Sequence, residues 1–482
     1  TTTSRVTYQT GNTKTTMRFF ICKDNTKFKK HSYTQYGQWS YYHDELVNVW
    51  EGSDYIVIYS GYLIEGDIED ACERWSFDEE NGNFFAIKLT KDKFEISVDY
   101  FQNHKIFLAR KYGTEISNYL PFMTCSEDDI TKTYLEYGQK DPHSREFSAE
   151  ENTTFFDHIN SFIPSYDYVG DCKTALKEEK WTDPDALADY IHKCMTQHAN
   201  LIRSRYKNRF ISLSEGIDSA VQSQYFYRDP QYCYTMLPCH AGDDGLEYKK
   251  IQAAKFPNVS FETFDTNKAI ENTLQYLKDG STRWASILPT MKQVADCKVK
   301  PDIVMYGVNG DEMFFRDLIP HLHMLMVEYK GERHIEAAIQ NNIDEKTHHY
   351  GATYTLGTHK TTQTYLDEWF EEWIKPEIDW ENAEYNMLKL LTPKLYTRSI
   401  STNNNVLTAS LYNDRRIYHE VFKTPKSFLL GDSMDSPIQR KILSKFNFEC
   451  ETPHKDQLYA VYEGIFYNIF RATWYRDISQ NI

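Results

Sequence analysis

Two short segments of the chain combine glycine with hydroxyl and carboxylate side chains, and each stands directly after an apolar run. The first is "SEGIDS" at residues 214–219, which follows Arg209-Phe210-Ile211. The second is "GVNGDE" at residues 307–312, which follows "DIVMY". Either segment alone is compatible with an ordinary turn. Their occurrence together, each at the end of an apolar run, indicates one composite site.

These residue types are suited to polyphosphate chemistry. A turn that opens a helix exposes backbone N–H groups that bind anions, and Ser214 and Ser219 add hydroxyl donors. Asp218 and Asp311 offer hard oxygen ligands, and Mg²⁺ is commonly held by one or two carboxylates together with phosphate oxygens and water. The metal also removes the repulsion between bare carboxylates and a triphosphate. The sequence therefore predicts a site for a magnesium-bound nucleotide.

The surrounding segments alternate between strand and helix patterns, which predicts a mainly parallel sheet. The ligand crevice of such a sheet lies beyond the carboxyl ends of its strands. We therefore expect Asp218 and Asp311 to face one cleft. The predicted strands are 209–213, 232–238, 259–265 and 301–307, and a helix is predicted from the first motif through Gln224.

The first third of the chain has a different pattern. Short β-branched and aromatic runs separated by turn residues predict antiparallel strands in a sandwich or layered α/β domain. These runs occupy residues 54–66, 83–89, 93–100 and 105–110. The polar stretch 136–170 is interpreted as a linker. We thus expect a domain at 17–135 and a second, α/β domain with added helices at 171–482.

A long amphipathic helix is predicted near the start of the second domain. Asp183 is a suitable N-cap and Pro184 is suited to the first helical position. Leu187, Ile191 and His198 recur at helical spacing, so that they share one face. We interpret His198 as a packing residue and not as a metal ligand.

The composition limits the class of protein. The chain has 482 residues and a formal net charge of −16, which argues against bulk nucleic-acid binding because that needs clustered Lys and Arg. No apolar stretch is long enough for a membrane span, and the polar N-terminus does not resemble a signal peptide. The nine scattered cysteines indicate free thiols in a reducing cytoplasm. A homo-oligomer is compatible with the sequence.

The two motifs resemble those of the asparagine synthetase B superfamily, which includes β-lactam synthetase and the lasso-peptide cyclases. "SEGIDS" is similar to the family's Ser-Gly-Gly-x-Asp-Ser loop, and "GVNGDE" to its Gly-Glu-Gly-x-Asp-Glu segment. Residues 242–256 and 411–422 resemble two further family segments, and the N-terminal runs resemble the strands of a class II glutamine amidotransferase domain. The resemblance implies a β-rich glutaminase-like (Ntn-type) domain followed by a doubly wound ATP pyrophosphatase domain.

The resemblance also implies a reaction and a set of residues. A substrate carboxylate attacks the α-phosphorus of ATP, pyrophosphate leaves, and an amine then displaces AMP from the acyl-adenylate. The substrates would be a small-molecule or peptide carboxylate and an amine, with ATP and Mg²⁺ as cofactors. The implied nucleotide-binding residues are Leu213, Ser214, Glu215, Gly216, Ile217, Asp218, Ser219, Met236 and Gly307, the metal ligands are Asp218 and Asp311, and the catalytic candidates are Glu312 and Lys455, with Lys441 and Lys445 as rivals of Lys455.

The sequence departs from the glutaminase pattern. The family uses a cysteine at the mature N-terminus, whereas this chain begins Thr1-Thr2-Thr3 and its first cysteine is Cys22. Ser60-Gly61 stands where the family has the Asn-Gly pair that binds the oxyanion. We therefore expect that glutamine is not hydrolysed and that the amine comes from elsewhere.

It also departs from the synthetase pattern at two positions. Glu215 replaces a glycine of the loop, which places a negative charge beside the pyrophosphate. Val308 replaces a residue that handles the attacking amine, and valine cannot transfer protons. Three hypotheses stay open: an AMP-forming amide ligase or cyclase, a catalytically degenerate binding or assembly protein, and an adenylating enzyme that uses another acceptor.

Overall fold

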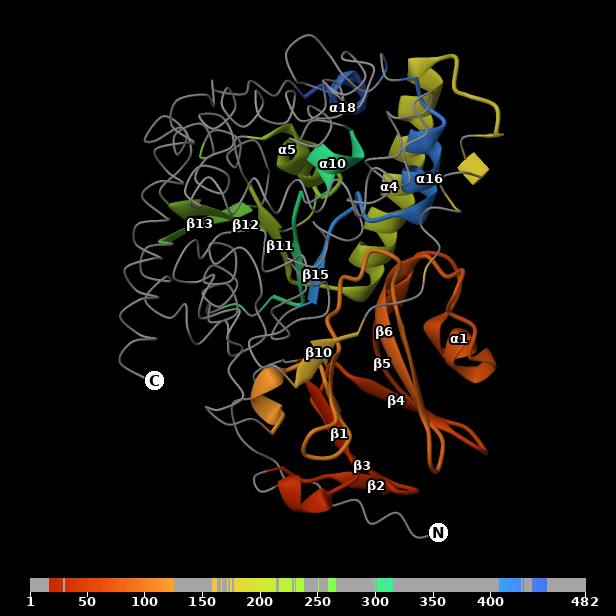
Figure 1. Ribbon diagram of the computed structural model, residues 1–482. Coiled ribbons are helices and arrows are strands. Elements are labelled where there is room, and N and C mark those ends of the chain that lie inside the picture. Colours follow the sequence, from red (N-terminus) through yellow and green to blue (C-terminus); the bar gives the residue numbers. More distant parts are fainter. Residues whose placement is uncertain are drawn as a thin grey trace, which may run out of the picture.

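The computed structural model is a mixed α/β protein, with antiparallel sheets in the N-terminal half and a parallel sheet later in the chain (Figure 1). This agrees with the predicted fold class at that level. The structure describes residues 17–28, 31–124, 158–162, 166, 171, 174–175, 177–213, 216–227, 229, 231–237, 250, 259–265, 299, 301–307, 309–314, 407–425, 428 and 436–448.

The N-terminal half contains two antiparallel sheets. One sheet has six strands in the order β10-β8-β9-β1-β3-β2, and the other has four in the order β4-β5-β6-β7. The six strands are β1 (Phe19–Cys22), β2 (Thr34–Tyr36), β3 (Trp39–His43), β8 (Phe107–Ala109), β9 (Glu115–Ser117) and β10 (Ile159–Ser161), and the four are β4 (Asn48–Glu51), β5 (Ile56–Leu63), β6 (Gly82–Leu89) and β7 (Phe94–Val98). Short helices lie at Asn25–Lys27, Ile68–Arg74 (α1) and Leu120–Phe122. The four predicted strands are confirmed as β5 to β8.

The strand β5 is buried on both faces, which explains its continuous apolar run. Successive side chains of a strand point to opposite faces. Ile56 and Ile58 belong to the core that also contains Phe19 of the other sheet. Val57 and Tyr59 belong to a smaller cluster against α1. The antiparallel sheets therefore stack on each other, and α1 covers the outer face of the four-stranded sheet.

The predicted linker at 136–170 contributes to this stack. Within it, β10 pairs antiparallel with β8, with Ile159 opposite Ala109 and Ser161 opposite Phe107. Ile159 is fully buried. The N-terminal sheets thus include residues as far along the chain as Ser161.

The later part contains a five-stranded parallel sheet in the order β13-β12-β11-β14-β15. Every pairing in it is parallel. The strands are β11 (Arg209–Ser212), β12 (Gln231–Leu237), β13 (Val259–Asp265), β14 (Ile303–Met305) and β15 (Leu407–Ala409). The first four confirm the predicted strands. The strand order reverses direction between β11 and β14, the kind of position where α/β sheets bind ligands.

The helices that accompany this sheet are α4 (Pro184–Arg205), α5 (Ile217–Gln224), α10 (Gly310–Met313), α16 (Arg415–Phe422) and α18 (Pro437–Ser444). The long predicted helix is confirmed as α4. Asp183 is its N-cap and accepts a hydrogen bond from the Asp185 backbone N–H at 2.9 Å. Pro184 occupies the first turn, where its missing N–H costs nothing.

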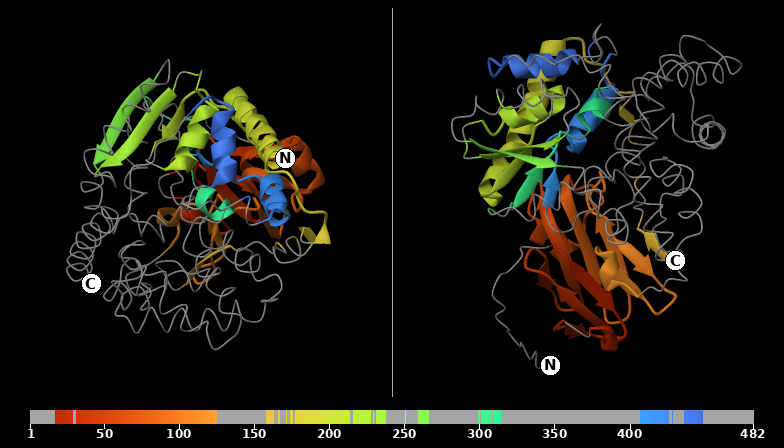
Figure 2. Two further views of the ribbon diagram at one scale, coloured as in Figure 1. Left: turned by 90° about the horizontal axis from the view of Figure 1, so that it is seen from above. Right: turned by 90° about the vertical axis from the view of Figure 1, so that its left-hand side faces the viewer.

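The two parts share one continuous core, and Figure 1 and the right view of Figure 2 show the antiparallel strands, red to orange, stacked below the parallel sheet, green to blue. Polar contacts also cross between them. The Tyr62 hydroxyl lies 2.8 Å from His198 Nε2, and Asn83 Nδ2 donates to the Thr408 carbonyl at 2.7 Å. His198 is buried, as its predicted packing role requires. Within the described residues, no helix has both the length and the apolar composition needed to cross a bilayer.

Candidate functional site

The two motifs identified in the sequence lie side by side in the structure. The first follows β11 and leads into α5, and the second follows β14 and leads into α10. Because β11 and β14 are parallel neighbours, their carboxyl ends lie at the same edge of the sheet. Both motifs are therefore at the point where the strand order reverses.

Glycine residues of the second motif pack directly against Asp218 of the first. A Cβ atom added at Gly310 would lie 2.3 Å from Asp218 Oδ1, and one added at Gly307 would lie 2.8 Å from the Ser219 backbone nitrogen. Real Cβ atoms do not approach other atoms so closely, so these glycines leave room for the carboxylate and the start of α5. Gly310 is the first residue of α10 and precedes Asp311 in the chain. The backbone that carries Asp311 is thus adjacent to the carboxylate of Asp218.

The other described residues of the first motif form the start of α5. Gly216 is the N-cap, and as a glycine it has no side chain to cap the helix. Ser219 is buried and its hydroxyl donates to the Gly216 carbonyl at 3.1 Å. Ile217 and Leu213 lie in the hydrophobic core. Because their side chains are buried in the core, Ile217 and Leu213 can offer only backbone groups to a ligand. Asp218, in contrast, is only half-buried.

The remaining predicted residues are placed as follows. Met236 lies in β12 opposite Phe264 of β13. Asp311 and Glu312 lie in α10. Ser214, Glu215, Val308 and Lys455 lie outside the described residues.

The two lysines considered as rivals of Lys455 lie on or beside α18 and pair with acidic residues of α4. Lys441 Nζ lies 2.6 Å from Asp185 Oδ1, and Lys445 pairs with Asp189. Both pairs are exposed, and such pairs contribute little to stability. In this geometry both lysines point toward α4 and connect α18 to it, and neither is paired with a described residue of the motif at Asp218.

Sequence reasoning missed two residues that contact Asp218. Gln439 of α18 donates its amide to Asp218 Oδ1 at 2.5 Å and to the Tyr412 hydroxyl at 3.0 Å. The Tyr412 hydroxyl in turn donates to the main-chain carbonyl of Asp218 at 3.2 Å. Their one sequence signal is their position: Tyr412 lies within the segment 411–422 that the sequence analysis singled out, and Gln439 lies on the helix before the predicted lysine loop.

The turn of the second motif has an unusual conformation. Asn309 has a φ of 68°, in the left-handed region that few non-glycine residues adopt, although asparagine tolerates it best. It is fully buried, and its amide donates to the side-chain oxygen of Asn413. The turn is closed by a hydrogen bond from the Gly310 N–H to the Gly307 carbonyl at 3.3 Å.

Two buried acceptor oxygens flank this arrangement. Asn309 Oδ1 and Gln439 Oε1 have no hydrogen-bond partner among the described residues. Buried polar groups are normally satisfied, so such atoms call for an explanation. Oxygen acceptors beside a carboxylate are the donor set that suits Mg²⁺ or a hydrated metal–phosphate group. No group of three or more potential metal-ligating side chains occurs among the described residues, so a cation here would need phosphate or water to complete its coordination.

The residues predicted from the glutaminase resemblance have structural roles. Gly61 has a φ of 103°, and a Cβ there would lie 2.0 Å from the Asn83 carbonyl oxygen, so that only glycine fits. Ser60 donates its hydroxyl to the Leu46 carbonyl at 2.6 Å. Cys22 is buried in β1, and burial raises the pKa of its thiol to about 12. A thiol held in its neutral form is a poor nucleophile.

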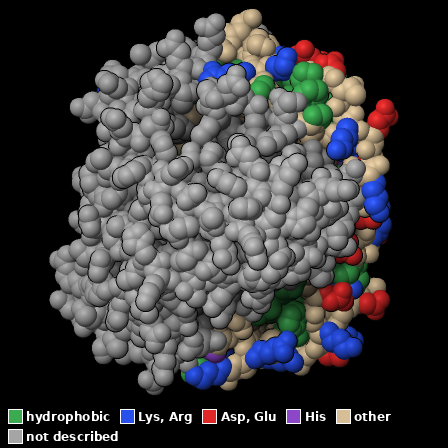
Figure 3. Space-filling view, turned by 45° about the horizontal axis from the view of Figure 1, so that its top comes forward, with side chains coloured by type: hydrophobic (Ala, Val, Ile, Leu, Met, Phe, Trp, Pro, Cys, Tyr) green, Lys and Arg blue, Asp and Glu red, His purple; other side chains and the backbone are tan. Residues whose placement is uncertain are grey.

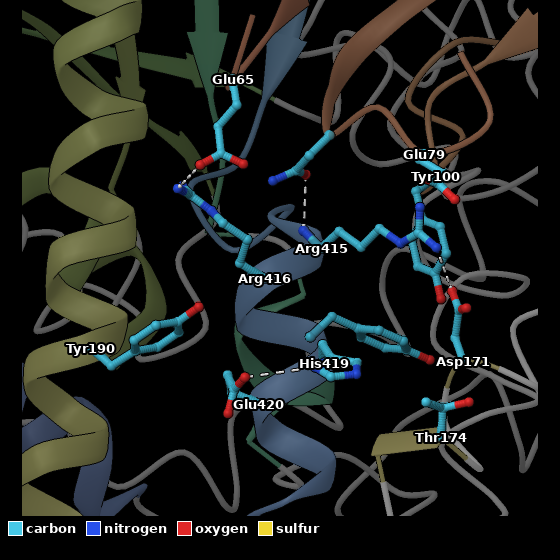
Figure 4. Close-up of a pocket in the computed structure, with 12 residues that line it drawn as sticks. Glu65, Glu79, Tyr100, Asp171, Thr174, Tyr190, Arg415, Arg416, His419 and Glu420 are labelled. Carbon is cyan, nitrogen blue, oxygen red and sulfur yellow. Dashed lines mark hydrogen bonds and ion pairs between the residues drawn. The ribbon is translucent and has the colours of Figure 1, made fainter. Parts of the chain in front are cut away.

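A cavity of about 440 Å³ lies between α16, α4 and the N-terminal part (Figure 4), and none of its described lining residues belongs to either motif. Figure 4 shows Arg415 directed toward Asp171 and Tyr100, and Arg416 directed toward Glu65. Arg415 lies 2.8 Å from Asp171 Oδ2, and Arg416 lies 3.0 Å from Glu65 Oε1. These arginines are neutralised by acidic partners, so the cavity does not present a cationic field to a nucleotide. On the face shown in Figure 3, the described surface likewise carries acidic and basic side chains close together.

A comparison with protein-family models and with curated proteins found no match for the chain.

Proposed function

We propose that the chain is an ATP-dependent, AMP-forming amide ligase or cyclase of the asparagine synthetase type. In this proposal the N-terminal sheets form a glutaminase-like domain, and the parallel sheet forms a doubly wound ATP pyrophosphatase domain. The observation that carries the proposal is the contact between Gly310 and the Asp218 carboxylate. Two motifs that resemble one family's nucleotide motifs meet where the strand order of the sheet reverses.

The proposal assigns a role to each part of the site. The backbone N–H groups at the start of α5 bind the pyrophosphate end of ATP, helped by the helix dipole. Asp218 and Asp311 would hold Mg²⁺, which would supply positive charge to neutralise the phosphates. The substrate carboxylate attacks the α-phosphorus, the bond to pyrophosphate breaks, and the amine then displaces AMP. Such catalysis depends mainly on positioning and on charge neutralisation. Lys455 and Glu312 remain the catalytic candidates.

We further propose that the amine does not come from glutamine hydrolysis within the described domain. The described cysteines Cys22, Cys72 and Cys194 are all buried, and burial raises the pKa of each thiol, to about 12, 12 and 11. None of these three is placed as an activated nucleophile. The amine would therefore belong to the substrate or to a second small molecule.

The test is the release of pyrophosphate from ATP across a panel of carboxylic acids, with and without Mg²⁺. The wild-type chain is expected to release pyrophosphate only with Mg²⁺ and with a suitable acid. Asp218→Asn should lower that rate by about two to three orders of magnitude, because a bound metal contributes several kcal/mol to transition-state stabilisation.

Asp92→Asn is the matched control, since Asp92 is an exposed aspartate between β6 and β7, far along the chain from both motifs. It should release pyrophosphate at the wild-type rate. If the wild-type chain binds no nucleotide in a calorimetric titration, the proposal fails and the binding or assembly hypothesis replaces it. If AMP remains covalently attached to a protein or nucleotide acceptor, the chain is an adenylating enzyme with another acceptor.

A further inference from the structure

A hydrogen-bonded network of buried side chains connects the N-terminal part of the protein to the second motif. Asn309 donates its amide to Asn413 Oδ1. Asn413 Nδ2 donates to Asn103 Oδ1 at 2.8 Å, and Asn103 Nδ2 donates to Asp99 Oδ1 at 2.8 Å. Asp99 and Asn103 lie in the loop between β7 and β8, Asn413 lies between β15 and α16, and Asn309 lies between β14 and α10. The network therefore joins three segments that are distant in sequence.

All four side chains of this network are shielded from water. Asp99 and Asn309 are fully buried, and Asn103 and Asn413 are 6% and 5% exposed. Asn413 and Asn103 each accept at the oxygen and donate at the nitrogen in the same direction, Asn309 at one end donates its amide, and the last acceptor is the carboxylate of Asp99. Hydrogen bonds in such a network polarise one another, and the low local dielectric makes a missing hydrogen-bond partner costly. The relative positions of the three segments are therefore strongly specified.

Asn309, at one end of the network, determines the shape of the motif turn 307–310. Asn309 adopts its left-handed conformation between Gly307 and Gly310, the two glycines that pack against the start of α5. A left-handed residue costs free energy unless its surroundings fix it. The amide of Asn413 supplies such a fixed point. A shift of Asn309 would move Gly310, and Gly310 has no free space beside the Asp218 carboxylate.

The N-terminal loop is itself fixed firmly. Asp99 accepts hydrogen bonds from the Phe101 backbone N–H at 3.1 Å and from the Asn103 backbone N–H at 3.0 Å, in addition to the Asn103 amide. Nearby, His104 Nε2 lies 2.7 Å from Asn83 Oδ1, and Asn83 donates to the Thr408 carbonyl of β15. The loop is thus a rigid support and not a mobile contact.

We infer that the N-terminal part positions the motif turn 307–310 against Asp218 through Asn103 and Asn413, which are positioning residues of the candidate site. The effect of this positioning on nucleotide binding rests on the proposed function. The positioning of the turn against Asp218 does not depend on that function. In this view the antiparallel sheets serve the chemistry of the second part by holding one turn in place, whether or not they hydrolyse any substrate.

The test compares Asn103→Leu with Asn118→Leu in the full chain. Leucine has a similar size to asparagine and removes both hydrogen-bonding groups. Asn118 is the matched control because it is likewise a buried asparagine of the N-terminal part. Its amide bonds only the backbone of Phe19 and Met17 in the described structure. Both variants should lose a similar amount of thermal stability, so that a difference between them in the readouts does not come from a general loss of stability.

The first readout is amide hydrogen exchange of the segment 307–314, whose Met313 N–H donates to the Asn309 carbonyl at 2.9 Å. Exchange there should become about ten-fold faster in Asn103→Leu than in Asn118→Leu. Equal exchange in the two variants overturns the inference, whatever the chain binds. Asn413→Leu should have the same effect, and the double variant with Asn103→Leu should add little, because both remove the same link.

The second readout is calorimetric titration with a non-hydrolysable ATP analogue and Mg²⁺. Asn103→Leu should weaken the binding about ten-fold while Asn118→Leu leaves it near the wild-type value. If the wild-type chain binds the analogue and Asn103→Leu binds it equally well, the positioning role is overturned for the nucleotide site. If the wild-type chain binds no analogue but the exchange difference is present, the proposed function fails and the positioning of the turn stands.

Discussion

The side-chain amide of Gln439 donates a hydrogen bond to the carboxylate of Asp218, with 2.5 Å between Nε2 and Oδ1. Gln439 belongs to α18 and Asp218 to α5, and the bond joins helices whose contact residues are 221 positions apart. Gln439 is fully buried, while Asp218 is half-buried. The orientation of the candidate metal ligand is therefore set by a helix from the last quarter of the chain.

This relationship predicts a metal-dependent effect of Gln439→Glu. The variant replaces a donor by a second carboxylate beside Asp218, and two carboxylates so close together cannot both be ionised without a cation. Without divalent ions we expect a loss of about 2 kcal/mol in the free energy of unfolding. Mg²⁺ bridges such a pair, so that it should raise the melting temperature of Gln439→Glu more than that of the wild type, as measured by thermal unfolding with and without the metal.

Gln38→Glu provides the control for this experiment. Gln38 also donates its amide, but to the exposed Asp92 carbonyl in the N-terminal part. Its stability should respond to Mg²⁺ as the wild type does. An equal response of the two variants would show that no cation binds between positions 218 and 439.

The close packing of Gly310 predicts that even one methyl group is not tolerated there. In Gly310→Ala the new Cβ would lie 2.3 Å from Asp218 Oδ1 and 2.5 Å from its Cγ. Alanine favours a helix by about 1 kcal/mol over glycine, but overpacking costs typically about 1–3 kcal/mol. We expect a net loss of stability in urea unfolding and weaker binding of the ATP analogue, because the carboxylate must move.

Gly66→Ala separates this steric effect from backbone strain. Gly66 has a φ of 91° and nothing within 4 Å of its added Cβ. The control should therefore lose stability through its backbone alone and bind the analogue normally. Wild-type binding by Gly310→Ala would place the nucleotide away from Asp218.

The buried His198 predicts a pH dependence of stability. Burial lowers the pKa of His198 from 6.5 to about 4, with the Arg416 charge acting in the same direction and Asp414 against it. Between pH 6.5 and 4 the unfolded chain thus binds a proton that the folded chain does not, and the stability from this group is lost as the pH falls. The free energy of unfolding should fall by about 1.4 kcal/mol per pH unit from this histidine alone.

The variant His198→Gln isolates this contribution. Glutamine keeps a polar group for the Tyr62 hydroxyl but does not titrate. Urea unfolding at pH 7 and pH 5 should show the stability difference between wild type and variant becoming smaller at pH 5. Asp99 and His104, whose pKa values burial shifts to about 7 and about 3, are present in both proteins and cancel in the comparison. The exposed His43→Gln serves as the control, and a constant difference for His198→Gln would contradict the prediction.

Local features of the sequence were enough to predict the strands β5 to β8 and β11 to β14 and the helices α4 and α5. The N-cap and proline at residues 183–184 define the start of α4, because capping depends on neighbouring residues only. The apolar runs before the two motifs define β11 and β14, because a strand buried on both faces needs a continuous apolar segment. The type of sheet, and the position of both motifs at one edge of it, follow from the alternation of strands and helices.

The connections between these elements were decided only by the tertiary structure. β10 arises within a stretch that is polar enough to be interpreted as a linker, since an edge strand of three residues leaves little pattern. The partners of Asp218 and Asn309, namely Gln439 and Asn413, are neutral amides that carry no spacing or charge signature. An amide acquires its role when the fold removes water from it and places a donor or acceptor beside it. The sequence determined which segments form the site, and long-range burial determined which side chains hold it in place.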